Sequence, residues 1–217
     1  MLKADLHIHT EYSMDCATSL DEIVTRCQEL GIGCVVIADH GTIEGALKLR
    51  EMAPFVVIVG EEILTHDGEI MGLFLKETIP SGISVDEAVA AIKAQGGLVS
   101  IPHPFDRLRV SAINDQVLER LVSQGLVDAL EVLNSRSILG RGLALARLFA
   151  GKHCLAMMAG SDAHSSSEIG HAYLEMPQFE GRDDFLKAVA RGKVCGGRSS
   201  PLVHFRSLAN KLRKQRR

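Results

Sequence analysis

The chain has 217 residues, a formal charge of −3 and 46% hydrophobic residues, which is typical of a globular protein with a sizeable core. This composition excludes a disordered chain, and the small net charge does not favour bulk nucleic-acid binding. No apolar run reaches membrane-spanning length and no signal segment opens the chain, so we expect a cytoplasmic protein that does not bind membranes. The five cysteines form no C-x-x-C pair, which predicts reduced thiols rather than disulfides or a zinc ribbon.

A short apolar run that begins almost at the N-terminus predicts the first strand. It carries His7 and His9, whose side chains would point the same way because strand residues alternate between faces. Two neutral imidazoles at one strand end make half of a metal site. The same spacing also occurs on ordinary surface strands, so the rest of the chain must decide between the two interpretations.

The elements that follow alternate between helical and strand patterns. Capping boxes at Ser19–Glu22 and Ser84–Glu87 predict two helix starts, and Asp67-Gly68 between apolar runs predicts a hairpin. The other predicted helices cover about residues 43–52, 114–124, 141–149 and 182–191. The later predicted strands cover about residues 34–38, 55–59, 70–75, 98–101, 127–133, 155–159 and 194–196. Strands alternating with helices predict an α/β fold with a mainly parallel sheet of about seven strands, closed or nearly closed into a barrel.

Side chains of the types that bind metal ions, or that hydrogen-bond to metal ligands, follow the predicted strands. They are His7 with His9, His40, Glu62, His103, Asn134, and Asp162 with His164. In a parallel barrel the carboxyl ends of the strands open on one face, where such enzymes assemble their sites. Each residue alone has an ordinary structural explanation, such as a helix cap for His40 or Asp162 and a rigid turn for His103. Together they predict a shared site.

The donor types indicate which ions this site would hold. Imidazoles and carboxylates without thiolates suit zinc, manganese or iron in a hydrolytic site. Seven or eight such ligands are too many for one tetrahedral ion, so we expect at least two divalent metals, with Glu62 placed to bridge them.

Five motifs surround these side chains: Asp5–Thr10, Ala38–Gly41, Gly60–Glu62, Ile101–Pro104 and Gly160–His164. In sequence and order they resemble the polymerase-and-histidinol-phosphatase (PHP) family of metal-dependent phosphoesterases. The resemblance implies a distorted (βα)7 barrel, similar to a TIM barrel, with up to three metal ions at the carboxyl ends of its strands.

The resemblance also implies a set of ligands. One metal would be held by His7, His9, Glu62 and Asp162, and a second by Glu62 and His103. A third would be held by Asp15, His40 and His164.

One position departs from the family pattern. Many members have a further histidine ligand between the Glu62 and His103 motifs, and this chain has none at that point. Glu69 is the expected substitute because its carboxylate can donate oxygen to the same ion. His66, on the predicted turn, is the alternative.

The leading functional hypothesis is hydrolysis of a phosphate ester, with a metal-bridging hydroxide as the nucleophile. Glu62 and Asp162 would act at the reacting centre, with Asp162 orienting or deprotonating the water, and His171 would protonate the leaving group. Arginines are candidates to bind the phosphate because a guanidinium matches two oxygens at once, although each is equally a solvated side chain. The candidates are Arg136, Arg141 and Arg198. The substrate would be a small-molecule or nucleotide phosphate, with short nucleic acid also open.

Two other functions remain open. Amidohydrolase-type barrels that cleave C–N bonds also begin with H-x-H, but Lys76, the lysine proposed as a bridge, is poorly placed. A non-catalytic metal-binding regulatory module would show lost ligands, and only the Glu69 position is questionable.

The remaining expectations concern organisation. We expect one barrel domain over residues 1–206 and a basic tail over 207–217, which is either solvated or in contact with a polyanion. Asp5 would orient an imidazole from behind. The pattern leaves the oligomeric state open.

Overall fold

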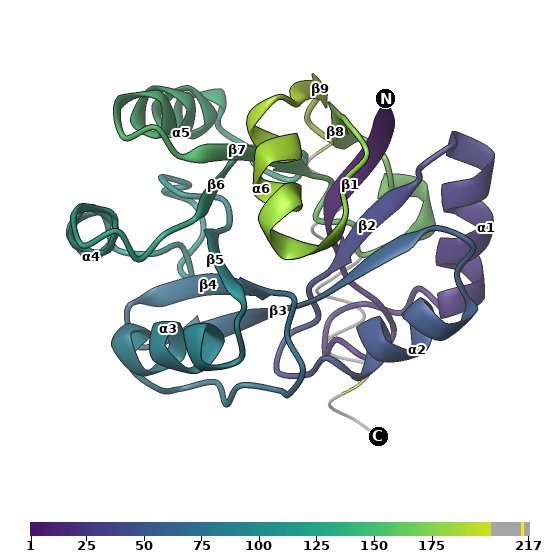
Figure 1. Cartoon of the computed structure of the whole chain (residues 1–217), viewed down its shortest axis with the longest axis horizontal. Helices are drawn as coiled ribbons and strands as arrows, with labels where there is room; N and C mark the ends of the chain where they lie inside the picture. The colour runs from purple at the N-terminus through teal and green to yellow at the C-terminus, as the bar shows by residue number, and fades with distance from the viewer. Residues whose placement is uncertain (201–213, 215–217) are drawn as a thin grey trace.

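The computed structural model describes residues 1–200 and residue 214. Within them, nine strands form one sheet in the order β7-β6-β5-β4-β3-β2-β1-β8-β9, which curves into a nearly closed barrel with helices around it (Figure 1). The strands are β1 (Leu2–Ile8), β2 (Cys34–Ile37), β3 (Val56–Thr65), β4 (Gly68–Leu73), β5 (Leu98–Ile101), β6 (Ala129–Asn134), β7 (Ala156–Gly160), β8 (Ala172–Met176) and β9 (Lys193–Gly196). The helices are α1 (Leu20–Leu30), α2 (Glu44–Met52), α3 (Val85–Ala94), α4 (Asp115–Ser123), α5 (Gly140–Lys152) and α6 (Gly181–Ala190), with a short 3₁₀ helix, η1 (Ser166–Glu168). The predicted α/β barrel is confirmed.

Local sequence signals account for the helix starts. At α1 the Ser19 side chain accepts a hydrogen bond from the Glu22 amide, and the Glu22 carboxylate accepts one from the Ser19 amide. The same reciprocal pair of bonds joins Ser84 and Glu87 at α3. Gly31 ends α1 with φ of +63°, a conformation that costs glycine little. Both predicted capping boxes are therefore confirmed.

The sheet mixes parallel and antiparallel pairs. Strands β1, β2 and β3 are parallel, as are β5, β6 and β7, whereas β4 runs antiparallel between β3 and β5. A two-residue turn, His66–Asp67, joins β3 to β4 and confirms the predicted hairpin.

The expectation of about seven mainly parallel strands needs correction. Strand β8, which was not predicted, pairs antiparallel with both β1 and β9. Its five residues alternate between buried and half-buried side chains, so it lacks the continuous apolar run that marks the interior strands.

The barrel closes where β1 meets the chain just beyond β7. The Asp162 amide donates to the His7 carbonyl at 2.7 Å, and the His9 amide donates to the Ala163 carbonyl at 3.0 Å. The backbones approach closely at Gly160, because a Cβ there would clash with the Cβ of His7. We call this region, residues 7–9 against 160–163, the seam.

Two apolar layers fill the fold. The outer layer lies between the sheet and helices α1 to α5, and the inner layer fills the barrel at the amino ends of the parallel strands. Helix α6 crosses that end of the barrel, where Phe185 is fully buried against Phe74 and Phe179 (Figure 1). The amino end is therefore plugged, and the carboxyl end remains for a site.

None of the helices in residues 1–200 and 214 combines the length and apolar character of a membrane span. The predicted basic tail, except for Lys214, lies outside the described residues. The Lys214 ammonium donates to the carbonyl oxygens of Glu11 at 2.5 Å and Ser13 at 2.7 Å.

Candidate metal centre

Four buried side chains converge at the carboxyl end of β1. His7 Nε2 and His9 Nε2 lie 3.1 Å apart, so the two imidazoles point the same way, as the strand pattern predicts. Glu62 Oε2 lies 3.2 Å from His7 Nε2 and 3.4 Å from His9 Nε2. Asp162 Oδ1 lies 3.3 Å from His9 Nε2. Nitrogen and oxygen atoms that could bind a metal ion thus surround one point.

Glu62 extends this group toward β5 and β2. Its Oε1 accepts a hydrogen bond from His103 Nε2 at 2.7 Å, while Oε2 faces His7. Glu62 was expected just past a strand end, but β3 continues to Thr65, and Glu62 forms a parallel bridge with His40 instead. Its position inside β3, next to the hairpin, lets one carboxylate face two sets of ligands.

Glu69, rather than His66, lies in the cluster. Glu69 is buried on β4, with Oε2 at 3.5 Å from His103 Nε2 and Oε1 at 3.9 Å from His40 Nδ1. His66 is exposed on the two-residue turn, where its amide donates to the Ile83 carbonyl. Antiparallel pairing explains the difference, because it turns the start of β4 toward the site edge while the turn itself stays in solvent.

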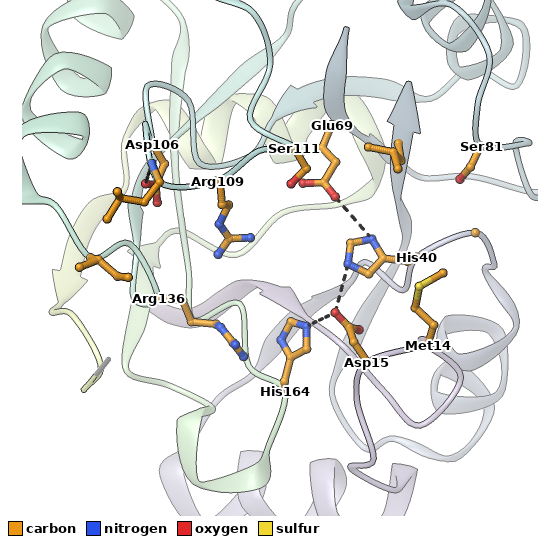
Figure 2. Close-up of a pocket in the computed structure, with 14 residues that line it drawn as sticks. Met14, Asp15, His40, Glu69, Ser81, Asp106, Arg109, Ser111, Arg136 and His164 are labelled. Carbon is orange, nitrogen blue, oxygen red and sulfur yellow. Dashed lines mark hydrogen bonds and ion pairs between the residues drawn. The ribbon is translucent and has the colours of Figure 1, made fainter. Parts of the chain in front are cut away.

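A third group lies nearest the solvent. His164 Nε2 is 3.0 Å and His40 Nε2 3.6 Å from Asp15 Oδ2, and the dashed lines of Figure 2 follow this chain from His164 through Asp15 to His40 and Glu69. His9 belongs both to this group and to the first, since its ring lies 4.2 Å from that of His164 between centroids. The three groups therefore form one continuous cluster.

The burial of this cluster fits it to divalent cations. Asp162 Oδ1 and Glu69 Oε2 are buried oxygen atoms with no hydrogen-bond partner, and each lies beside an imidazole nitrogen. Leaving such atoms unpaired is costly unless a cation binds them. Imidazole nitrogens with carboxylate oxygens are the donor set that zinc, manganese and iron accept.

The electrostatics of the cluster agree. Burial alone would lower the pKa of His9, but Asp162 and Glu62 outweigh it and raise that pKa to about 9. Burial opposes ionisation of Asp162, yet Arg109 and His7 hold the pKa of its carboxyl well below the ordinary value. The Asp162 carboxylate therefore stays ionised, as a carboxylate that binds a cation must be.

Glu131, on β6, touches the cluster from behind and was not predicted. Its Oε1 lies 3.1 Å from His7 Nδ1, and its Oε2 accepts from the His103 amide at 2.6 Å and from Asn134 Nδ2 at 3.0 Å. A lone carboxylate inside an apolar run gives no signal of this role in the sequence. Asp5, expected behind an imidazole, accepts instead from the amides of Ser161 and Gly170.

A pocket of about 590 Å³ opens over the cluster. Asp15, His40, Glu69 and His164 lie in its wall, and the side chains of Arg109 and Arg136 project into the same space (Figure 2). Four exposed apolar side chains also line it, namely Met14, Leu64, Leu108 and Ile138.

The arginines around the site are placed differently. Arg109, which was not predicted because it lies in a loop without a motif, donates to Asp162 Oδ2. Arg136 is buried and pairs with Glu168 at 3.3 Å. Arg141 and Arg198 are exposed outside the pocket wall, and the Arg198 guanidinium donates to the Ile138 carbonyl.

Two other predicted residues also lie away from the cluster. His171 is exposed, and its ring bonds Ser199 Oγ at 2.7 Å. Lys76 is exposed beyond β4 and does not line this pocket. The structure therefore brings together the nine predicted metal ligands, but only Arg136 of the other predicted site residues.

Two family models match the chain. The PHP domain matches residues 5–78, and the PHP-associated domain matches residues 140–194. The first match contains six of the nine candidate ligands, from His7 to Glu69, and the second contains Asp162 and His164.

Two relatives come from Methanocaldococcus jannaschii, and both carry the name uncharacterized protein. One is 39% identical over 62% of this chain and 82% of its own length. The other is 36% identical over 82% of this chain and 71% of its own length.

Solved structures share the fold at low identity. A two-domain protein from Bacteroides vulgatus containing a predicted PHP-like metal-dependent phosphoesterase has a TM-score of 0.74 at 18% identity, covering 90% of this chain and 65% of its own. An amidohydrolase from Chromobacterium violaceum scores 0.62 at 17% identity, over 80% and 92% of the two chains. Endonuclease Q, in complex with a DNA duplex, scores 0.63 at 15% identity, over 87% and 56%. The matches to the PHP and PHP-associated family models show that this chain belongs to the PHP family.

Proposed function

We propose that this protein hydrolyses a phosphate monoester with the help of two or three divalent metal ions. The observation that supports this most strongly is the continuous cluster of ligand groups at the floor of a pocket into which two arginines project. Carboxylates and imidazoles at the floor would hold cations, while guanidinium groups above them would bind the phosphoryl oxygens of a substrate.

The proposed ligands fall into three overlapping sets. The first is His7, His9, Glu62 and Asp162, the second is Glu62, Glu69 and His103, and the third is Asp15, His40 and His164, with His9 at its edge. When bound, the metal ions would lower the pKa of a water molecule and neutralise charge on the phosphoryl group.

The chain's own residues would orient the reactants. Arg109 already faces Asp162 and lies in the pocket wall, so it is positioned to hold a phosphoryl oxygen next to the ligands. Arg136 projects into the pocket beside His164 (Figure 2). Such clamps act by fixing the reacting atoms in line, which removes an entropic part of the barrier. We do not assign the leaving-group proton to His171, because its ring is bonded to Ser199 outside the pocket wall.

The pocket also favours a class of substrate. A cavity of about 590 Å³ accommodates a molecule the size of a nucleotide or sugar phosphate. The exposed apolar side chains in its lining, which include Met14 and Leu108, suit a leaving group with an apolar face. A single nucleotide or a similar small phosphate is therefore the proposed substrate.

The test is an assay with purified protein and added manganese or zinc. Phosphate monoesters, including nucleotides, are offered beside amides and lactones. We expect phosphate release that disappears in the His7→Ala/His9→Ala double variant and falls at least tenfold in Arg109→Ala, because a charge-assisted hydrogen bond contributes about 1.5–3 kcal/mol. Full turnover by the double variant would exclude the proposed function, and turnover of amides alone would assign C–N hydrolysis instead.

A further inference from the structure

Strand β6 supplies no proposed metal ligand, yet its carboxyl end contacts three of them. Glu131 and Asn134 are buried there, on either side of an irregularity in the β6–β7 pairing between Glu131 and Leu133. An irregularity of this kind changes the direction in which side chains point. Here it lets two residues three positions apart face the same cluster.

The orientation of the Asn134 amide follows from the backbone. The Arg136 amide donates at 2.9 Å to the Asn134 side chain, and only the Oδ1 oxygen can accept that bond. The Nδ2 group must then face the opposite way, where it lies 3.0 Å from Glu131 Oε2 and 3.2 Å from Asp162 Oδ2. One amide therefore gives a hydrogen to each of two buried carboxylates.

Glu131 is surrounded by donors. Its Oε2 receives the His103 amide and Asn134 Nδ2, which leaves Oε1 for His7 Nδ1 at 3.1 Å. A carboxylate can only accept hydrogen bonds, so this contact requires the proton of His7 on Nδ1. Nε2 carries the lone pair once the ring is neutral, and it lies 3.2 Å from Glu62 and 3.8 Å from Asp162, where a cation would replace the second proton.

From these contacts we infer that Glu131 is a positioning residue that selects the tautomer of His7 able to bind metal, with Asn134 tying the same carboxylate to Asp162. The backbone bond to His103 makes Glu131 common to the first and second ligand sets. The inference rests on the metal part of the proposed function but not on its hydrolytic part.

The test replaces one carboxylate oxygen of Glu131 with an NH₂ group. In Glu131→Gln the amide oxygen is expected where His103 and Asn134 donate, so the new NH₂ group faces His7 Nδ1 and makes it an acceptor. The His7 proton then moves to Nε2 and blocks metal binding there. We expect zinc affinity, measured by competition with a chromophoric chelator, to fall roughly 10- to 100-fold. Glu61→Gln is the matched control, since Glu61 is also buried and accepts a backbone amide, that of Ile79, without touching a ligand.

Two further measurements separate tautomer selection from a general structural effect. In a His7→Ala background, Glu131→Gln should cause no additional loss of zinc affinity, because its target is gone. In zinc-loaded protein with ¹⁵N-labelled histidine, the His7 Nδ1–H signal should be present in the wild type and in Asn134→Ala, and absent in Glu131→Gln.

The outcomes are distinguishable. Wild-type affinity in Glu131→Gln, an equal loss in both backgrounds, or loss of the Nδ1–H signal in Asn134→Ala would each overturn the inference. If the wild-type protein binds no zinc, the proposed function and the inference fail together. If it binds zinc but releases no phosphate, only the hydrolytic proposal fails.

Discussion

The pKa values of His9 and His164 are shifted in opposite directions. Asp162 and Glu62 overcome the effect of burial on His9 and raise its pKa to about 9, so the metal-free protein carries a proton there at neutral pH. Burial, with His9 adding to the effect, lowers the pKa of His164 to about 4, so His164 is already neutral. A cation that binds His9 must displace a proton, whereas one that binds His164 need not.

Metal affinity should therefore rise with pH well beyond the range of an ordinary histidine. We expect zinc affinity at the first ligand set to increase by roughly tenfold per pH unit for each displaced proton between pH 7 and about 9. Titrations at fixed ionic strength measure this slope. An affinity that is constant between pH 7 and 9 would contradict it.

Glu69 differs from His66 in one decisive respect, since one is buried in the cluster and the other is exposed on the turn. Glu69→Gln keeps the shape but removes the charge from an oxygen 3.5 Å from His103 Nε2. We expect this variant to bind one ion fewer per chain, measured by elemental analysis after metal-replete expression. His66→Gln is the control and should keep the wild-type content. Equal content in both variants would remove Glu69 from the ligand set.

At the scale of elements, the geometry of the seam depends on the absence of a side chain at Gly160. Gly160→Ala would place a Cβ against the backbone and Cβ of His7, where no flexible side chain can yield. We expect a loss of about 1–3 kcal/mol in unfolding free energy and weaker zinc binding, because β1 must shift.

Gly151→Ala provides the control for that variant. Gly151 lies in the last turn of α5, and an added Cβ would meet only Met157 Cε at 3.9 Å. The helical propensity of alanine should stabilise the protein by up to about 1 kcal/mol without changing zinc binding. Denaturant unfolding of both variants checks the pair, and an unperturbed Gly160→Ala would show that the seam tolerates the side chain.

Much of the fold was predictable because its signals are local. The capping boxes of α1 and α3 and the hairpin turn each depend on residues within four positions of one another. Interior strands such as β2 are continuously apolar because both faces are covered. Strand β8 was missed because its half-buried, five-residue pattern becomes a strand only through pairing with β1 and β9, which are distant in sequence.

The same difference between local and long-range signals applies to the residues of the site. Its histidines and acidic residues mostly follow predicted strands, so a barrel topology alone brings them together. Glu131 lies inside β6, and in the sequence it is only a charged residue within an apolar strand. Its role becomes visible in the fold, which places it behind His7. Arg109 reaches Asp162 from a loop of irregular conformation, and no periodicity in the sequence predicts where such a loop lies.

For the molecule as a whole, the proposed ligands lie on both sides of the seam. His7 lies in β1, His9 follows it and Asp162 follows the edge strand β7, so a bound cation would link β1 to the chain beyond β7. Removal of metal by a chelator should lower the melting temperature by several degrees, since ligand at 100 times its Kd stabilises by about 2.7 kcal/mol. Hydrogen exchange should speed up most at the amides of His9 and Asp162, with little change in α3. Uniform acceleration, or none, would argue against a link across the seam.

Helix α6 and Phe185 determine from which end of the barrel a small molecule can reach the cluster. Because they fill its amino end, the substrate of the proposed hydrolysis would enter, and both products would leave, through the pocket above the proposed metal ligands. A phosphoryl group bound at the floor lies deeper than the alcohol to which it was joined. In the proposed reaction the alcohol would then depart first and inorganic phosphate last, so we expect free phosphate to compete directly with the substrate for the emptied protein.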